Sequence, residues 1–172
     1  MNQPEATANL RRIKDSYRKF ISDNFETAAQ DCSACPTFGA CCTDAHFVNV
    51  HITPLEAVAI RETLQQKLNL EELQKINKRI ADTIETYSLS STGDTFTQTY
   101  ACPLFEPKIG CLVHSEAKPA PCIQHACYER QEDLPPQCLQ DNAERKIEQL
   151  NQELYGEGWR WLPIPIQLTV NS

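Results

Sequence analysis

The sequence contains little glycine and no long apolar run. Only 5 of its 172 residues are glycine, which leaves little material for the glycine-rich turns that cradle phosphate groups. No segment approaches the ~20 apolar residues of a membrane-spanning helix. The N-terminal stretch also lacks the apolar run of a secretory signal. We therefore expect a cytoplasmic protein with no membrane partner.

Positive charge is scarce as well. The chain has 16 basic and 23 acidic side chains, a formal net charge of −7. Because a protein that binds nucleic acid through its phosphates needs a basic surface, we expect no nucleic-acid partner. Hydrophobic residues make up 41% of the chain, and the length is typical of one domain. The sequence therefore predicts a single domain over residues 1–172.

Hydrophobic periodicity predicts a mainly α-helical fold with about four helices, minor β-structure and Cys-rich metal-binding loops at one end. The expected helices cover residues 5–28, 54–67, 70–87 and 137–155. Thr53, Pro54 and Glu56 form a typical helix start, in which threonine and glutamate make a capping box. Gly156 and Gly158 are expected to end the last helix.

Shorter elements are expected between these helices and after them. Residues 47–52 alternate like a strand, residues 95–100 suit an extended piece, and residues 121–128 a short helix. The prolines of the C-terminal segment predict an extended arm over 159–170, with an exposed partner-binding segment as the alternative. The basic residues of the first helix are interpreted as a solvated face rather than a docking surface; they are Arg11, Arg12, Lys14, Arg18 and Lys19.

Eight of the nine cysteines fall into two groups within a cysteine cluster region of about residues 32–128. The groups are Cys32, Cys35, Cys41 and Cys42, then Cys102, Cys111, Cys122 and Cys127. An odd count and a reducing cytoplasm disfavour a disulfide framework. The helices at 54–67 and 70–87 are expected to pair antiparallel and return the chain, so that both groups meet at one end of the domain.

Thiolate chemistry explains such groups. The C-x-x-C step of Cys32 and Cys35 lets two sulfurs reach one metal, and soft sulfur donors favour zinc, copper(I) or iron–sulfur clusters. Neighbouring side chains usually point apart, so Cys41 and Cys42 are expected to diverge. That leaves open two metal sites, a multinuclear cluster, or one ligand beside a structural thiol.

Other cysteine and histidine residues are weaker candidates. Cys138 is interpreted as an inert thiol at the start of the last helix. His114 and His125 lie inside the second cysteine group and are better auxiliary ligands than His46 or His51. Eight thiols already suffice for two four-coordinate sites, so no histidine is required.

The order of these motifs resembles that of the CxxCxxCC, or YkgJ-type, family of zinc- or iron-chelating cysteine cluster proteins. The motifs are Cys32-x2-Cys35-x5-Cys41-Cys42, Cys102-Pro103-Leu104, Cys111-Leu112-Val113-His114, Lys118-Pro119 and Cys122-x4-Cys127. The resemblance covers about half of the chain. This sequence departs from the family in its longer spacing before the double cysteine. It also departs at Lys118-Pro119 and Cys122-Ile123, where the family has Arg-Pro and Cys-Arg.

The resemblance implies metal chelation by the eight cysteines, a bacterial cytoplasmic protein and no assigned reaction. We therefore expect the cofactor to be zinc or an iron–sulfur cluster, and the binding partner to be this metal ion or cluster. A protein partner is left open. The alternative is a metal-free thiol redox sensor or thiol–disulfide exchange protein. No G-x-S-x-G, Walker loop or H-E-x-x-H occurs, so no catalytic residue is predicted and enzyme activity stays open.

Overall fold

Helices dominate the structure, as expected. The computed structural model describes residues 1–170, apart from the side chain of Ser33. Helix accounts for 58% of these residues and strand for 7%. The expectation of about four helices was wrong, because the described part of the chain contains seven α-helices. They are α1 (Gln3–Asn24), α2 (Ala40–Thr43), α3 (Pro54–Lys67), α4 (Leu70–Thr86), α5 (Ala120–Gln124), α6 (Gln137–Tyr155) and α7 (Ile164–Thr169).

The β-structure consists of three antiparallel pairs of two-residue strands. They are β1 (Ala29–Gln30) with β5 (Cys127–Tyr128), β2 (His51–Ile52) with β6 (Leu162–Pro163), and β3 (Phe105–Glu106) with β4 (Gly110–Cys111). The strand expected over 47–52 is therefore confined to its last two residues. The extended piece expected over 95–100 begins instead with a 3-10 turn, η3 (Thr95–Thr97), which the side chain of Asp94 caps by accepting the N–H of Phe96.

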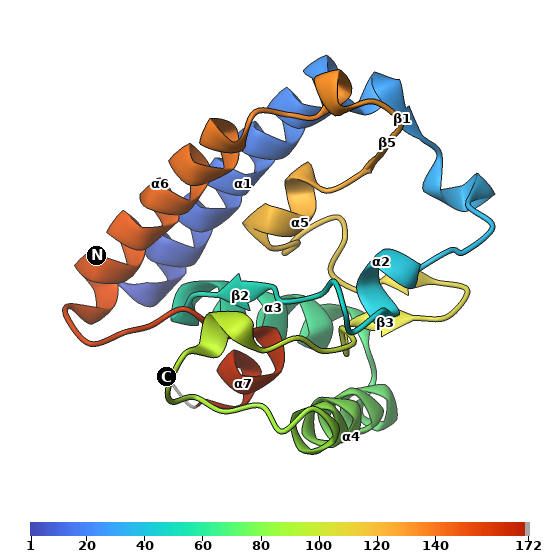
Figure 1. Cartoon of the computed structure of the whole chain (residues 1–172). Coiled ribbons are helices and arrows are strands. Elements are labelled where there is room, and N and C mark those ends of the chain that lie inside the picture. Colours follow the sequence, from blue (N-terminus) through green and yellow to red (C-terminus); the bar gives the residue numbers. More distant parts are fainter. Residues whose placement is uncertain (171–172) are drawn as a thin grey trace.

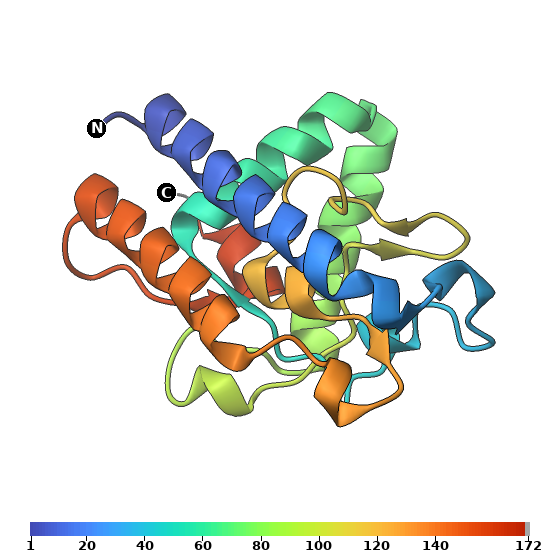
Figure 2. The same cartoon turned by 90° about the horizontal axis from the view of Figure 1, so that it is seen from above.

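The two longest helices form one layer. α1 and α6 lie side by side and antiparallel, and α5 packs against both (Figures 1 and 2). The expected bounds of α6 are confirmed, whereas α1 ends at Asn24 and continues into the 3-10 turn η1 (Glu26–Ala28). Two further 3-10 turns, η2 (Cys32–Ala34) and η4 (Gln131–Asp133), flank the β1–β5 pair.

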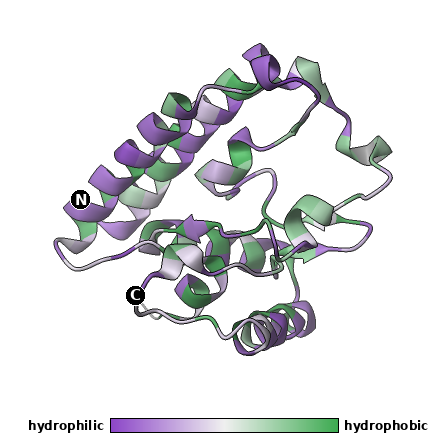
Figure 3. Cartoon of the chain, in the orientation of Figure 1, coloured by the Kyte–Doolittle hydropathy of each residue, from purple (hydrophilic) through white to green (hydrophobic). Residues whose placement is uncertain are grey.

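α3 forms the centre of the core. Its buried side chains point in almost every direction, and they include Leu55, Ala57, Val58, Ala59, Ile60 and Leu64. α4 buries only one stripe, centred on Ile76 and Ile80, and its outer face is hydrophilic (Figure 3). The capping box expected from Thr53 and Glu56 is present at the start of α3.

One residue of the supposed solvated face of α1 is buried. Lys14 is only 2% exposed, and its Nζ lies 2.7 Å from the Oε1 atom of Glu56, which is fully buried. The expectation for Lys14 was therefore wrong. The same glutamate accepts the backbone N–H of Thr53 through its other oxygen. The carboxylate of Glu56 thus caps α3 and also forms an ion pair with Lys14, the only charged side chain of α1 that is buried among the described residues.

The C-terminal segment is neither an extended arm nor an exposed one. Its residues form β6 and then α7, whose first turn contains Pro165. Proline suits the first turn of a helix because the missing N–H has no partner there in any case. Ile164 and Ile166 are buried, and α7 packs against both α3 and α4. α3 and α4 consequently diverge from their junction and do not form the expected antiparallel hairpin (Figures 1 and 2).

Candidate metal centre

The two cysteine groups meet, but through backbone pairing rather than a helix hairpin. The N–H of Cys102 donates to the carbonyl of Cys42 at 2.7 Å, and the N–H of Tyr100 donates to the carbonyl of Val48 at 2.9 Å. At the other end of the region, Gln30 pairs with Cys127 in the β1–β5 ladder. These contacts join the chain before α3 to the chain after α4.

The cysteines lie mostly on short regular elements rather than in loops. α2 carries the adjacent pair, while Cys111 lies on β4, Cys122 on α5 and Cys127 on β5. The expectation of Cys-rich loops was therefore wrong. α2 starts at Gly39, which has a φ of 84°. A Cβ atom there would lie 2.1 Å from Cζ of Phe105, so only glycine allows this ring to cover the start of α2.

Four half-buried cysteines, Cys42, Cys102, Cys111 and Cys122, form what we call the inner thiol group. Burial raises the pKa of Cys42 and of Cys102 from 9.0 to about 12 each. Burial also raises the pKa of Cys122 and of Cys111. Nearby members of the group add to the rise at Cys42, Cys102 and Cys122, so the four sulfurs lie within electrostatic range of one another. The thiols of this group are protonated at neutral pH.

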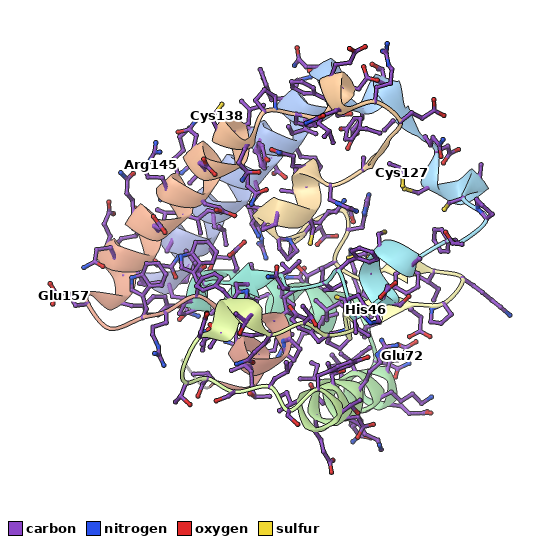
Figure 4. All side chains as sticks on the ribbon, viewed as in Figure 1. His46, Glu72, Cys127, Cys138, Arg145 and Glu157 are labelled. Atoms are coloured by element: carbon purple, nitrogen blue, oxygen red, sulfur yellow. The ribbon has the colours of Figure 1, made fainter. Side chains whose placement is uncertain are left out.

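Three further cysteines, Cys32, Cys35 and Cys127, form the outer thiol group. Cys32 and Cys127 are neighbours, and Figure 4 shows Cys127 beside η2. Burial and the nearby Cys127 raise the pKa of Cys32. The sulfur of Cys35 lies 3.5 Å from the hydroxyl of Thr37, which lowers the pKa of that half-buried thiol.

Cys41 lies next to the inner thiol group and adds to the rise in the pKa of Cys42. The expectation that the two adjacent sulfurs diverge stays a prediction. The short helix α2 leaves Cys41 exposed and Cys42 half-buried.

Three cations lie within electrostatic range of the thiols: Arg79, Lys118 and Lys67, the last of which lowers the pKa of Cys111 and pairs with Glu116. Arg79 of α4 lowers the pKa of Cys102, and its Nη1 donates to Glu106 at 2.9 Å. Its Nε and Nη2 atoms are buried and have no partner among the described residues. Lys118 lies near both groups, because it lowers the pKa of Cys32, Cys111 and Cys122. Sequence reasoning missed Arg79, since nothing in the spacing of α4 relates it to a cysteine.

The remaining candidates differ in their surroundings. Burial and Lys118 lower the pKa of both His114 and His125, so both rings are half-buried near the same lysine. His51 is buried, with its ring nitrogens 2.7 and 3.0 Å from the carbonyl oxygens of Asn49 and Thr95, which gives it a structural role. Cys138 is exposed on α6, away from the other cysteines (Figure 4).

No preassembled site holds a metal in this arrangement. Among the described residues, no three histidine, cysteine, aspartate or glutamate side chains are grouped closely enough to bind an ion. No family model matches the chain, and neither does any curated protein or solved structure. None of the helices within residues 1–170 is long and apolar enough to cross a membrane. The resemblance to the cysteine cluster family therefore stays a prediction.

Proposed function

We propose that this is a cytoplasmic metal-binding protein of the CxxCxxCC type, with zinc or an iron–sulfur cluster held by its eight clustered cysteines. No reaction is assigned to it. One observation carries the proposal: four thiols from distant parts of the chain lie within electrostatic range of one another, and one of them, Cys102, is also within range of a guanidinium that has buried donors without acceptors.

The unpaired donors of Arg79 support thiolates rather than thiols at this place. A buried N–H without an acceptor costs about 1–3 kcal/mol. A protonated thiol is a weak acceptor, whereas a thiolate next to a guanidinium makes a charge-assisted hydrogen bond. Because a coordinating metal deprotonates a cysteine outright, ligation of Cys102 supplies the missing acceptor.

The charge balance of the region supports the same proposal. A metal ligated by four thiolates carries net negative charge, and burying such a site requires nearby cations. Arg79 lies beside the inner thiol group, and Lys118 lies between the inner and outer groups. These two side chains compensate the charge that the metal-bound thiolates bring.

The grouping of the sulfurs suggests how they divide. The inner thiol group supplies the ligands of one four-coordinate centre. The outer thiol group with Cys41 would supply the ligands of the second. When bound, zinc supplies folding stability, and an iron–sulfur cluster supplies electron transfer.

A metal-free thiol protein is the second candidate. The contact of Cys32 with Cys127 and the lowered pKa of Cys35 favour it, because exchange needs an accessible thiolate near a second thiol. The raised pKa of each inner thiol disfavours it, since buried protonated thiols react slowly.

The test is anaerobic purification followed by elemental analysis, acid-labile sulfide determination and a visible spectrum of the same sample. We expect either zinc without colour or iron with sulfide and visible absorption. Cys102→Ser should lose metal from the inner centre, while Cys138→Ser, a matched change of an exposed cysteine, should keep the full content. A folded, metal-free protein that takes up no zinc or iron on reconstitution would overturn the proposal.

A further inference from the structure

An aromatic cavity of about 390 Å³ lies where the segment before β6 meets η3. Both tryptophans of the chain, Trp159 and Trp161, line it together with Phe96. These rings come from two segments that are distant in the sequence. No cysteine is among the residues that line the cavity, so what it binds is independent of the proposed metal centre.

The ring of Phe96 is held in place although it is 59% exposed. One of its faces stacks on the buried ring of His51, with the two centroids 4.3 Å apart and the planes 22° from parallel. Its backbone is fixed as well, because its N–H donates to Asp94 and its carbonyl accepts from the side-chain amide of Asn49. A rigid aromatic ring that leaves one face to solvent is not explained by packing of the core.

The two tryptophans are half-buried and are tied to α6 by their indole N–H groups. Trp161 Nε1 donates to Glu148 at 3.1 Å, and Trp159 Nε1 donates to Gln152 at 3.3 Å. Their ring centroids lie 6.2 Å apart, and their planes meet at 62°. The indole donors are thus already satisfied, so the aromatic rings themselves are what this corner offers to a ligand.

Negative charge exceeds positive charge around these rings. The charged side chains of the lining are the carboxylates of Asp94 and Glu148 and the guanidinium of Arg160. Arg160 donates to the carbonyl of Ser91 and forms no ion pair with either carboxylate. Because the face of an aromatic ring attracts cations and two carboxylates add to that attraction, the cavity favours a positively charged ligand.

We infer that this cavity binds a small quaternary ammonium cation, of which choline is a simple form. The cation sits in the corner between the two indole planes and against Phe96, and Glu148 supplies the counter-charge. A quaternary nitrogen has no N–H and therefore needs no acceptor, while its round methyl groups fit rings that meet at an angle. A sugar is disfavoured, because a flat ring stacks on one plane and its hydroxyls would find the indole donors already paired.

The first experiment titrates choline chloride into the full-length protein and follows tryptophan fluorescence, with sodium chloride at matched concentration as the control. Both tryptophans line the cavity, so the whole signal comes from it. We expect a saturable change. Dimethylbutanol has the shape of choline with carbon in place of the charged nitrogen, and it should bind at least about tenfold more weakly. No saturable change with choline, or equal binding of the uncharged analogue, would overturn the proposal.

Matched variants test the charge. Glu148→Gln removes the charge but keeps an oxygen that can accept from Trp161, and it should weaken choline binding by at least about fivefold. Glu153→Gln makes the same change at an exposed position of α6 outside the lining, and it should alter binding less than about 1.5-fold. Equal losses in the two variants would show that only the overall charge matters and would contradict the assignment.

A second pair of variants tests the aromatic ring. Phe96→Leu keeps an apolar side chain but removes the ring, so choline binding should weaken by at least about threefold. Phe47→Leu changes a phenylalanine that is 78% exposed and outside the lining, and it should leave binding unchanged. Thermal melts of both variants check that they are folded. Unchanged binding in a folded Phe96→Leu protein would remove the aromatic site from the proposal.

A free cation and a trimethylated lysine of another protein present the same quaternary group. We assign the free cation, because a cavity of about 390 Å³ is of the size that encloses a small molecule. A short peptide that contains trimethyl-lysine should bind no more tightly than choline. Binding of that peptide at least about tenfold tighter than choline would overturn the assignment to a small molecule.

Discussion

α3 and the cysteine-bearing segments lie in contact but are stabilised in different ways. α3 is capped at its start and buried along most of its length. The cysteine-bearing segments consist of two-residue strands, 3-10 turns and very short helices, with half-buried or exposed sulfurs. Both regions bury apolar side chains, since Tyr100, Leu104 and Val113 are buried as well, but only α3 does so as a long, capped helix.

The largest expected effect is on the core side. Lys14→Met leaves the buried carboxylate of Glu56 without its cation, so the free energy of unfolding should fall by about 3–5 kcal/mol. Urea denaturation of the variant measures the change. The double variant Lys14→Met/Glu56→Gln removes the unpaired charge and should recover part of the loss. A loss below about 1 kcal/mol in the single variant would mean that the pair is solvated.

A somewhat smaller effect compares two isoleucines directly. Ile60 is fully buried on α3, and Ile109 is 73% exposed at the β3–β4 turn. Ile60→Ala should destabilise the protein by about 2–5 kcal/mol, because it leaves a cavity in the core. Ile109→Ala should change the free energy of unfolding by less than about 0.5 kcal/mol. Urea denaturation measures both variants. A similar loss in the free energy of unfolding for both would show that the two regions do not differ in how much apolar burial stabilises them.

Metal removal should act only on the cysteine side. After chelation, amide hydrogens between Gly39 and Cys42 and around Cys111 should exchange at least about tenfold faster, while those of α3 keep their protection. Hydrogen–deuterium exchange with mass spectrometry resolves the two regions. Uniform loss of protection would show that the metal supports the whole fold.

The smallest effect is a pH dependence of the metal-free protein. Burial raises the pKa of Cys102 to about 12, above the 9.0 of an exposed thiol, so folding favours the protonated form. The stabilisation that the protonated Cys102 thiol adds to the free energy of unfolding is fully present below pH 9, and it is lost as the pH rises from 9 towards 12. Between pH 9 and 10 the loss is at most about 1.4 kcal/mol. Thermal melts of metal-free wild type and Cys102→Ala over this range should show a shallower slope in the variant. Zinc-loaded protein, whose ligands are already deprotonated, should lack this loss.

Local signals in the sequence predicted the long helices well. The capping box at Thr53 set the start of α3, and Gly156 set the end of α6, because caps act within one turn of the chain. α7 was missed because six residues that include Pro165, directly preceded by Pro163 at the cap, have no helical tendency of their own. It forms because Ile164 and Ile166 are buried where this segment packs against α3 and α4.

The sequence identified eight candidate ligands, which stay a prediction, but not how their side chains are grouped in the fold. The cysteine spacing identified which thiols belong together in sequence, but the inner thiol group mixes members of both sequence groups. Only the tertiary pairing of Cys102 with Cys42 brings them together. The positions of Arg79 and Lys118 near the thiols also depend on tertiary contacts, and the burial of Lys14 depends on the separate packing of α1 against α3. The hydrophobic periodicity of the first helix does not distinguish Lys14 from the other basic residues of that helix.

The hydrogen bond from Cys102 to Cys42 closes a loop that contains all of α3 and α4. Closing so long a loop is slow unless the chain within it is already compact. The inner thiol group is complete only once Cys122 has been synthesised, well after α3 and α4. If this group holds the metal as proposed, metal loading follows the synthesis of both helices.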